Sequence, residues 1–281
     1  MRIGFIGAGK VGFTFGKYFT VQGADVSGYY SLHETSAKEA AEFTHTKYYA
    51  RIEDIVSDSD ALFLTCPDGA IENVWDQIKR YSLTGKCICH CSGSLSSDVF
   101  SEISRKEAYG YSIHPLFAVS SKRRSYREIS KAYITIEGHE KYLNLWAEFF
   151  EDLGNPVKII SAENKALYHC AAVFVSNFVC GLFDEGISLL KQCGFDESDA
   201  VAALGPMLVN NAETLEEKGT VEALTGPVER ADAVTVKRHL EAVSEREAMI
   251  YKHISEVLVE IAQKKNPKRD YSGIRKLLSE K

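Results

Sequence analysis

Residues 163–178, ENKALYHCAAVFVSNF, place polar side chains that could do chemistry in an otherwise apolar helical stretch. Lys165, His169 and Ser176 recur at helical spacing, so they share one face of a helix. Asn177 lies on the flank of this stripe, next to His169. Burying a lysine or a histidine without a partner is costly. The stripe therefore predicts the wall of a pocket.

These residue types suit a reaction that moves a proton. Lysine and histidine are candidate acid–base groups, while asparagine and serine can hold a carbonyl oxygen. We predict that Lys165, His169 and Asn177 are catalytic and that Ser176 binds substrate. A structural alternative stays open, in which the lysine reaches solvent and the histidine is a satisfied core residue. Tyr168 is expected to point elsewhere and to help build the core.

A glycine motif predicts a dinucleotide site. GAGKVG follows an apolar strand pattern and opens a helical pattern, within a strand–helix–strand unit. Its first glycine permits a tight turn, its second lets the backbone approach a pyrophosphate, and its third lets helix and strand pack closely. The pyrophosphate would lie at the helix N-terminus. The predicted cofactor contacts in this motif are Gly7, Ala8, Gly9, Lys10, Val11 and Gly12.

The end of the second strand pattern, GYYSLHETS, indicates which dinucleotide is bound. NAD sites usually place an acidic residue about 20 residues beyond the glycines, where it binds the ribose hydroxyls. The expected position here is Tyr30 or Ser31, and neither side chain is acidic. Ser31, His33 and Ser36 can instead form a pocket for a 2′-phosphate, so NADP is favoured over NAD. A plain polar loop is the alternative.

Loops that follow strand patterns supply further candidates, since functional groups tend to lie there. CSGS follows a strand, so Ser92 is predicted to contact the cofactor and Ser94 the substrate. His114 ends another strand and can bind a carboxylate or move a proton. Arg230 can hold an acidic substrate with two hydrogen bonds. Asp232 is expected to be either a helix N-cap or a site residue.

Two kinds of architecture must position these candidates. Up to about residue 160, short apolar runs such as RIGFIGA, DALFLTCP and CICHCSG alternate with helical patterns. This alternation predicts a parallel sheet with helices on both faces. Beyond it, long helical stretches follow over residues 162–193, 197–217 and 232–264. We therefore predict an α/β Rossmann-like dinucleotide-binding domain over residues 1–160 and an all-helical domain over residues 161–281.

Composition limits the class of protein. The 33 Lys and Arg residues against 39 Asp and Glu give a formal charge of -6, so nothing favours a nucleic acid or an anionic membrane as partner. The basic run Ser121–Arg127 is interpreted as a solvated loop, with contact to an acidic substrate as the alternative. No leader peptide is expected, and the most apolar stretch, AAVFVSNFVCGLF, is expected to be too short and too polar to span a bilayer.

The cysteines indicate a compartment. There are seven, and three of them lie in CICHC, where Cys87, Cys89 and Cys91 would share one face of a strand. Zinc ligands usually converge from a turn at other spacings. We expect buried reduced thiols, no metal and a cytoplasmic location, with a metal or redox role as the alternative.

Several motifs together resemble a family of predicted oxidoreductases that joins a Rossmann-like NADP-binding domain to a helical domain, DUF2520. They are GAGKVG, TCPDGAI from Thr65, HCSGSLSSDVF from His90, GYSIHPLFAV from Gly110, YHCAAVFVSNF from Tyr168 and ALTGPVERAD from Ala223. The resemblance covers nearly the whole chain and implies that Cys66 and Pro67 lie at the cofactor. The family pattern favours glycine where this chain has Ala231.

More distantly, the layout is similar to that of 6-phosphogluconate, β-hydroxyacid and ketopantoate dehydrogenases and pyrroline-5-carboxylate reductase. The resemblance implies a helical domain like the C-terminal domain of 6-phosphogluconate dehydrogenase, and a homodimer formed through it. In the hydroxyacid branch, a lysine at the position of Lys165 does acid–base work and an asparagine one turn later binds substrate. This chain has His169 at the asparagine position.

We therefore expect an NADP-dependent reductase or dehydrogenase of a small, anionic carbonyl or hydroxy compound. Two alternatives stay open. One is an imine reductase close to pyrroline-5-carboxylate reductase. The other is a dinucleotide-binding sensor or partner protein without turnover.

Overall fold

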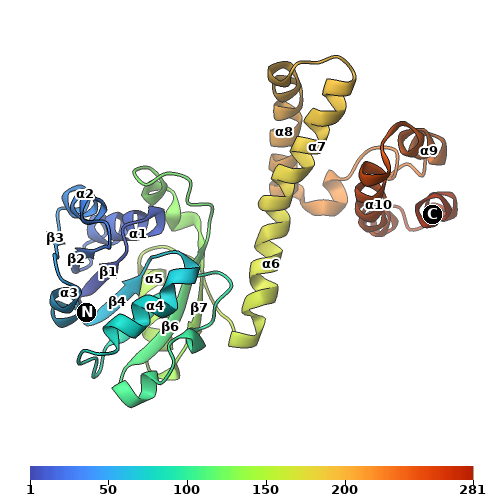
Figure 1. Ribbon diagram of the computed structural model, residues 1–281. Helices are drawn as coiled ribbons and strands as arrows, with labels where there is room; N and C mark the ends of the chain where they lie inside the picture. The colour runs from blue at the N-terminus through green and yellow to red at the C-terminus, as the bar shows by residue number, and fades with distance from the viewer. Residues whose placement is uncertain (281) are drawn as a thin grey trace. The chain divides into compact units, whose positions relative to one another are not determined.

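A computed structural model describes residues 1–280 of the chain, which divide into two compact units (Figure 1). The first unit is Met1–Ser176 and the second begins at Asn177. The last strand of the sheet ends at Ile159, close to the boundary predicted at residue 160. That boundary stays a prediction, because the first helix after the sheet belongs to the first unit.

The first unit is an α/β domain. Its strands are β1 Ile3–Ile6, β2 Val26–Tyr30, β3 Lys47–Tyr48, β4 Ala61–Leu64, β5 Cys87–His90, β6 Tyr109–Leu116, β7 Tyr133–Gly138 and β8 Val157–Ile159. Its α-helices are α1 Lys10–Val21, α2 Glu34–Thr44, α3 Ile52–Asp58, α4 Asp68–Ile78, α5 Leu143–Asp152 and α6 Lys165–Val175. The short elements β3 and α3 are absent from the sequence-based prediction.

The strands form one eight-stranded sheet in the order β3-β2-β1-β4-β5-β6-β7-β8. Every neighbouring pair is parallel except β6 and β7, which are antiparallel. The prediction of a parallel sheet is therefore correct for most of the sheet and wrong at this pair. The connection between β6 and β7 contains only short 3-10 turns, Ser125–Arg127 and Ile129–Lys131, whereas a parallel return usually needs a crossover helix.

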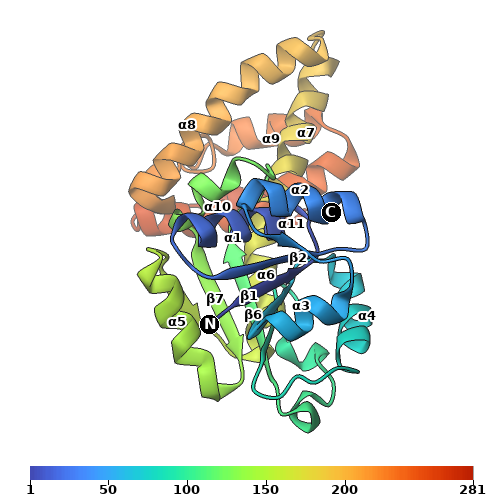
Figure 2. The ribbon, with the colours of Figure 1, turned by 90° about the vertical axis from the view of Figure 1, so that its left-hand side faces the viewer.

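Helices cover both faces of the sheet and close two cores (Figure 2). One core packs α1, α2 and α5 against alternate strand residues, and it contains Trp146 and Phe63. The other packs α3 and α4 against the opposite face, and it contains Trp75 and Leu62. Both tryptophans are completely buried, at 0% exposure. Side chains alternate between the two faces along each strand, as a sheet covered on both sides requires.

The second unit is helical. Its helices are α7 Asn177–Gln192, α8 Glu197–Ala223, α9 Ala233–Ala242, α10 Glu245–Lys265 and α11 Ser272–Ser279. The single helix predicted over residues 232–264 is in fact α9 and α10, because Ser244 and Glu247 form a capping box that starts a new helix. Asp196 caps α8, and Asp232 caps α9, which is one of the two roles expected of Asp232. A small core around Val236, Val259 and Ile274 joins α9, α10 and α11.

The helical run Ala162–Gln192 is longer than the apolar stretch singled out in the sequence. It contains 31 residues, and its mean hydropathy of 1.7 makes it long and apolar enough to cross a membrane by length and composition alone. The expectation concerned only the shorter stretch AAVFVSNFVCGLF within this run, and it stays a prediction. One such helix is weak evidence for a membrane, because core helices of soluble proteins pass the same test. The run is also broken at Ser176, whose φ of -120° and ψ of -74° are not helical.

Candidate active site

A cavity of about 580 Å³ opens at the carboxyl ends of β1, β2 and β4. In a parallel sheet this edge is where ligands bind. Seven of the predicted cofactor contacts line the cavity, namely Gly7, Ala8, Gly9, Ser31, His33, Cys66 and Pro67. Four others, Lys10, Val11, Gly12 and Ser92, do not line it. The cavity therefore coincides with the predicted dinucleotide site.

The glycines shape this cavity as the motif predicts. Gly7 has a φ of +111°, and a Cβ there would lie 2.8 Å from the backbone carbon of Thr65. A Cβ on Gly12 would lie 2.6 Å from Thr65 Oγ1 and 2.7 Å from Gly7 O, so α1 packs directly on the turn. Gly9 is the N-cap of α1 and offers no side-chain cap, and the first turn has no acidic residue. These features fit an anion at the helix N-terminus.

Several polar side chains line this cavity. Ser31, His33 and Ser36 line it together with Lys122, which comes from the basic run between β6 and β7. No acidic side chain lines this cavity, within the described residues. The side chain of Lys122 is 38% exposed and also lines the cavity, so the interpretation of the basic run as a solvated loop stays a prediction.

Lys165 is the most unusual ionisable residue of the first unit. Its side chain is buried, at 2% exposure, although it begins helix α6. The ammonium donates hydrogen bonds to the backbone oxygen of Ser92, at 3.0 Å, and to Ser112 Oγ, at 2.7 Å. Burial lowers the pKa of Lys165 to about 8. The alternative in which this lysine reaches solvent is wrong.

The loop after β5 is held by a neutral histidine and a carboxylate. His90 Nε2 lies 3.0 Å from the backbone oxygen of Ser96, and His90 Nδ1 accepts from the Ser92 amide at 3.2 Å. Burial lowers the pKa of His90 to about 4, which fits a neutral ring with its proton on Nε2. Ser92 Oγ donates to Asp68 Oδ2 at 2.6 Å, and Ser94 Oγ does so at 3.3 Å. The two serines therefore share one carboxylate.

His114 and Tyr168 form a second polar pair. His114 Nδ1 lies 2.8 Å from the hydroxyl of Tyr168. Burial lowers the pKa of His114 to about 3, with the charge of Lys165 adding to the effect, and burial raises the pKa of Tyr168. Both groups are therefore uncharged, and one hydrogen bond joins Nδ1 to the hydroxyl. The expectation that Tyr168 only builds the core is wrong.

His169 completes this group of residues. Its ring is half-buried, and its centroid lies 6.5 Å from that of His114. A Cβ on Gly93 would lie 2.5 Å from His169 Cδ2 and 3.0 Å from His114 Nε2, so glycine leaves room for both rings. Lys165, His169, His114 and Ser92 are therefore brought together by α6, β6 and the loop after β5. Asp68 and Tyr168 join them without having been predicted.

The other predicted site residues lie elsewhere. Ser176 Oγ donates to the backbone oxygen of Ala172, one turn back in α6, at 2.7 Å. Asn177 begins α7 in the second unit, because the helix is interrupted between these two residues. Arg230 is exposed in the turn before α9. The continuous polar stripe predicted from Lys165 to Asn177 is thus only partly realised, and the roles of its last residues stay predictions.

The three cysteines of CICHC face apolar surroundings. Burial raises the pKa of Cys87 to about 11 and raises those of Cys89 and Cys91 further. A thiol with a raised pKa stays protonated, which opposes both metal binding and redox chemistry. Within residues 1–280, no group of three or more metal-ligating side chains is found.

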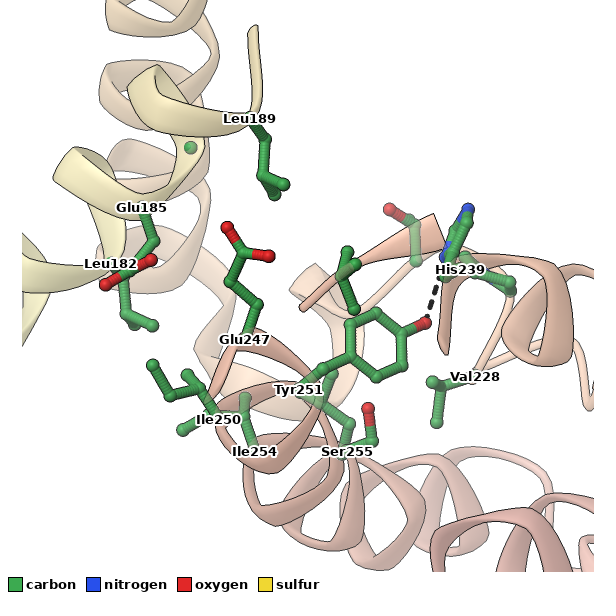
Figure 3. A pocket seen from close by; sticks show the side chains of 15 residues that line it. Leu182, Glu185, Leu189, Val228, His239, Glu247, Ile250, Tyr251, Ile254 and Ser255 are labelled. Carbon is green, nitrogen blue, oxygen red and sulfur yellow. Dashed lines mark hydrogen bonds between the residues drawn. The ribbon is translucent and has the colours of Figure 1, made fainter. Parts of the chain in front are cut away.

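The second unit contains an apolar pocket of about 420 Å³ (Figure 3). Leu182, Leu189 and Ile254 line it, and Figure 3 shows His239 and Tyr251 at one side, with 3.1 Å between His239 Nδ1 and the tyrosine hydroxyl. Glu185 and Glu247 also line it. Glu185 is paired with Arg246, and Glu247 caps α10. Both carboxylates already have partners, so this pocket offers apolar surface more than chemistry.

Two family models match the chain. A model described as a Rossmann-like domain matches residues 1–115, and the domain of unknown function DUF2520 matches residues 132–257. The chain joins a Rossmann-like domain to a DUF2520 domain. The predicted family resemblance and fold class are thereby confirmed. The DUF2520 match begins within the sheet, just before β7, and extends through most of α10.

Solved structures share the fold of this Rossmann-like and DUF2520 chain. Protein TM1727 from Thermotoga maritima is 25% identical with a TM-score of 0.74, covering 93% of this chain and 98% of its own. A reductive aminase from Aspergillus terreus, in complex with NADPH and ethyl levulinate, is 17% identical with a TM-score of 0.62, covering 95% and 99%. A pyrroline-5-carboxylate reductase from Coxiella burnetii is 15% identical with a TM-score of 0.58, covering 99% and 98%. No curated protein matches the chain.

Proposed function

We propose that this protein is an NADP-dependent oxidoreductase that acts on a small carbonyl, hydroxy or imine compound. The observation that carries the proposal is Lys165, a buried lysine whose pKa is lowered to about 8, at the sheet edge that also opens onto the dinucleotide cavity. Acid–base groups work best when their pKa lies near the working pH. Strongly shifted pKa values cluster at functional sites, which supports this role for Lys165.

A short chain of contacts links the lysine to the cavity. Pro67 lines the cavity, and the next residue, Asp68, accepts from Ser92 Oγ at 2.6 Å. The backbone oxygen of Ser92 in turn accepts from Lys165 Nζ at 3.0 Å. A substrate between the cavity and α6 would therefore meet a proton donor on one side and the cofactor on the other.

The residues of the chain would bind, orient and protonate the substrate. When bound, NADPH supplies the hydride. We assign Lys165 as the acid–base group, with His169 beside it in contact with substrate. In the tautomer with its proton on Nε2, neutral His114 would donate to a carbonyl or carboxylate oxygen, and the Ser92 hydroxyl is held by Asp68. The glycine loop and the N-terminus of α1 fit a pyrophosphate.

An imine is the second candidate for the reacting group. Several solved structures of this fold carry names of imine reductases, reductive aminases or a pyrroline-5-carboxylate reductase. The reduction of an imine also needs a proton on nitrogen, so the same lysine and histidine suit both substrate classes. The carboxylate of Asp68 near the serines favours a substrate with a cationic nitrogen.

NADPH oxidation with a panel of keto acids, aldehydes and cyclic imines tests the proposal. We expect turnover with at least one class. Within that class, the Lys165→Met variant should be much slower at unchanged NADPH affinity. Tight binding of NADPH without oxidation by any compound would contradict the proposal and favour a sensor. The panel also separates carbonyl from imine substrates.

We further propose that the protein is a homodimer paired through its helical unit. Large apolar side chains are exposed there, among them Met207, Val209 and Val257, at 63%, 56% and 54% exposure. The apolar pocket of this unit adds to that surface. Large exposed apolar patches mark sites of protein–protein contact, which supports an interface in this unit. A cytoplasmic location stays a prediction from the unpaired cysteines.

A further inference from the structure

Lys122 is the one residue of the basic run that lines the dinucleotide cavity, within residues 1–280. It does so beside Ser31, His33 and Ser36, which follow β2. The end of the second strand is where a dinucleotide fold reads the adenosine ribose. The basic run follows β6 along the chain, and it brings Lys122 to the cavity that residues after β2 also line.

The lysine is held in place but keeps its charge available. Its ammonium lies 4.7 Å from the ring centroid of Phe13 in α1, which is a favourable cation–π contact. Its nearest carboxylate is Glu39 in α2, at a loose 3.8 Å. Arg123 binds that same carboxylate at 2.9 Å. The Arg123 guanidinium, more than Lys122, lowers the pKa of Glu39. The negative charge of Glu39 is therefore neutralised mainly by the arginine.

We propose that Lys122 binds the 2′-phosphate of NADPH and is the main determinant of NADPH preference over NADH. This inference rests on the proposed function. The phosphate would gain a cation from Lys122 and hydroxyl donors from Ser31 and Ser36, and no carboxylate lines the cavity to repel it. A lysine binds phosphate as a point charge, so no fixed bidentate geometry is needed. The usual arginine after the second strand is replaced by a lysine about ninety residues further along the chain.

Fluorescence titration of the full chain with NADPH and with NADH tests this inference. We expect Lys122→Ala to weaken NADPH binding by roughly 10- to 100-fold, since a charge-assisted contact is lost. NADH affinity should stay unchanged. Lys122→Glu should make the protein bind NADH more tightly than NADPH, because the new carboxylate would repel the 2′-phosphate. The matched control is Arg124→Ala, which removes an exposed cation of the same basic run that does not line the cavity and should change the NADPH affinity less than Lys122→Ala does.

Each outcome identifies which proposal fails. An equal loss for NADPH and NADH, or no loss in Lys122→Ala, overturns the role of Lys122 while the oxidoreductase proposal stands. An equal effect of Arg124→Ala shows that general positive charge is responsible and also overturns it. If the unaltered protein binds neither cofactor, both proposals fail. Thermal melts of each variant show that the fold is kept. Titration with 2′,5′-ADP and with 5′-AMP, which lacks only the 2′-phosphate, repeats the comparison without nicotinamide.

Discussion

Lys165 loses its hydration when the α/β unit folds, and two oxygen acceptors return only part of that free energy. The lost hydration outweighs the two hydrogen bonds, so burial lowers the pKa of Lys165 from 10.5 to about 8. Ionisable residues with strongly shifted pKa values cluster at functional sites. At the residue scale, the lysine is therefore the best place to separate a catalytic role from a structural one.

The pH dependence of stability gives the first prediction. Below about pH 8, Lys165 is charged in both the folded and the unfolded protein, so the penalty of burying the charge is fully present. Between pH 8 and 10.5 the folded protein has lost this proton while the unfolded chain still binds it, so this residue makes stability rise with pH. We expect urea unfolding at both ends of this range to show that the rise is lost in Lys165→Met.

Turnover of the same variant gives the second prediction. Lys165→Met should reduce turnover by about two to four orders of magnitude, because a general acid is removed. His169→Gln, which keeps the size and polarity of the ring, should lower turnover less and raise the apparent KM if the histidine only contacts substrate. A larger loss in His169→Gln, together with the disappearance of the pH dependence of kcat, would show that the histidine is the acid.

At the scale of helices and strands, the site could be predicted where local sequence patterns determine it, and not where distant residues meet or a helix ends. The sequence identifies β1, the glycine turn and α1 because apolar runs and glycines act locally. It also places Lys165 and His169 together through helical spacing. It could not place Asp68, Tyr168 or Lys122, since their contacts join residues far apart in the chain, such as His114 and Tyr168, 54 residues apart. Spacing also fails where a helix stops, as it does at Ser176.

The turn before α9 gives the third prediction, at the scale of one element. Ala231 has a φ of 59°, in the left-handed region that costs an L-residue about 1–2 kcal/mol. Asp232 then caps the helix through the Thr235 amide at 3.0 Å. The family's preference for glycine at this position agrees with this conformation. Ala231→Gly should therefore raise the stability of the helical unit by about 0.5–1 kcal/mol.

Circular dichroism melts check this change, with Ala233→Gly as the matched control. Ala233 is the first residue of α9, where the backbone is helical, so glycine should lower stability by up to about 1 kcal/mol. If both substitutions destabilise the protein, the strain at Ala231 is too small to matter.

At the scale of the whole molecule, the helical unit exposes large apolar side chains that a second copy of the chain could cover. We expect sedimentation velocity at micromolar concentration to show a homodimer. Val257→Glu, at a position 54% exposed in the helical unit, should shift the protein toward monomer. The matched control is Val21→Glu, at a position 62% exposed in the α/β unit, which should leave the dimer intact. A single 31.3 kDa species for the unaltered protein would exclude a stable dimer.

The chain has two tryptophans, and Trp75 and Trp146 both lie in the α/β unit, on opposite faces of one sheet. Tryptophan fluorescence therefore reports on that unit alone, and the helices from α7 onward contribute no tryptophan emission. Unfolding followed by tryptophan emission measures the sheet domain, whereas far-ultraviolet dichroism is dominated by helices, many of them in the second unit. The gap between the two midpoints measures how cooperatively the two units melt. Engineering a label is unnecessary for that experiment.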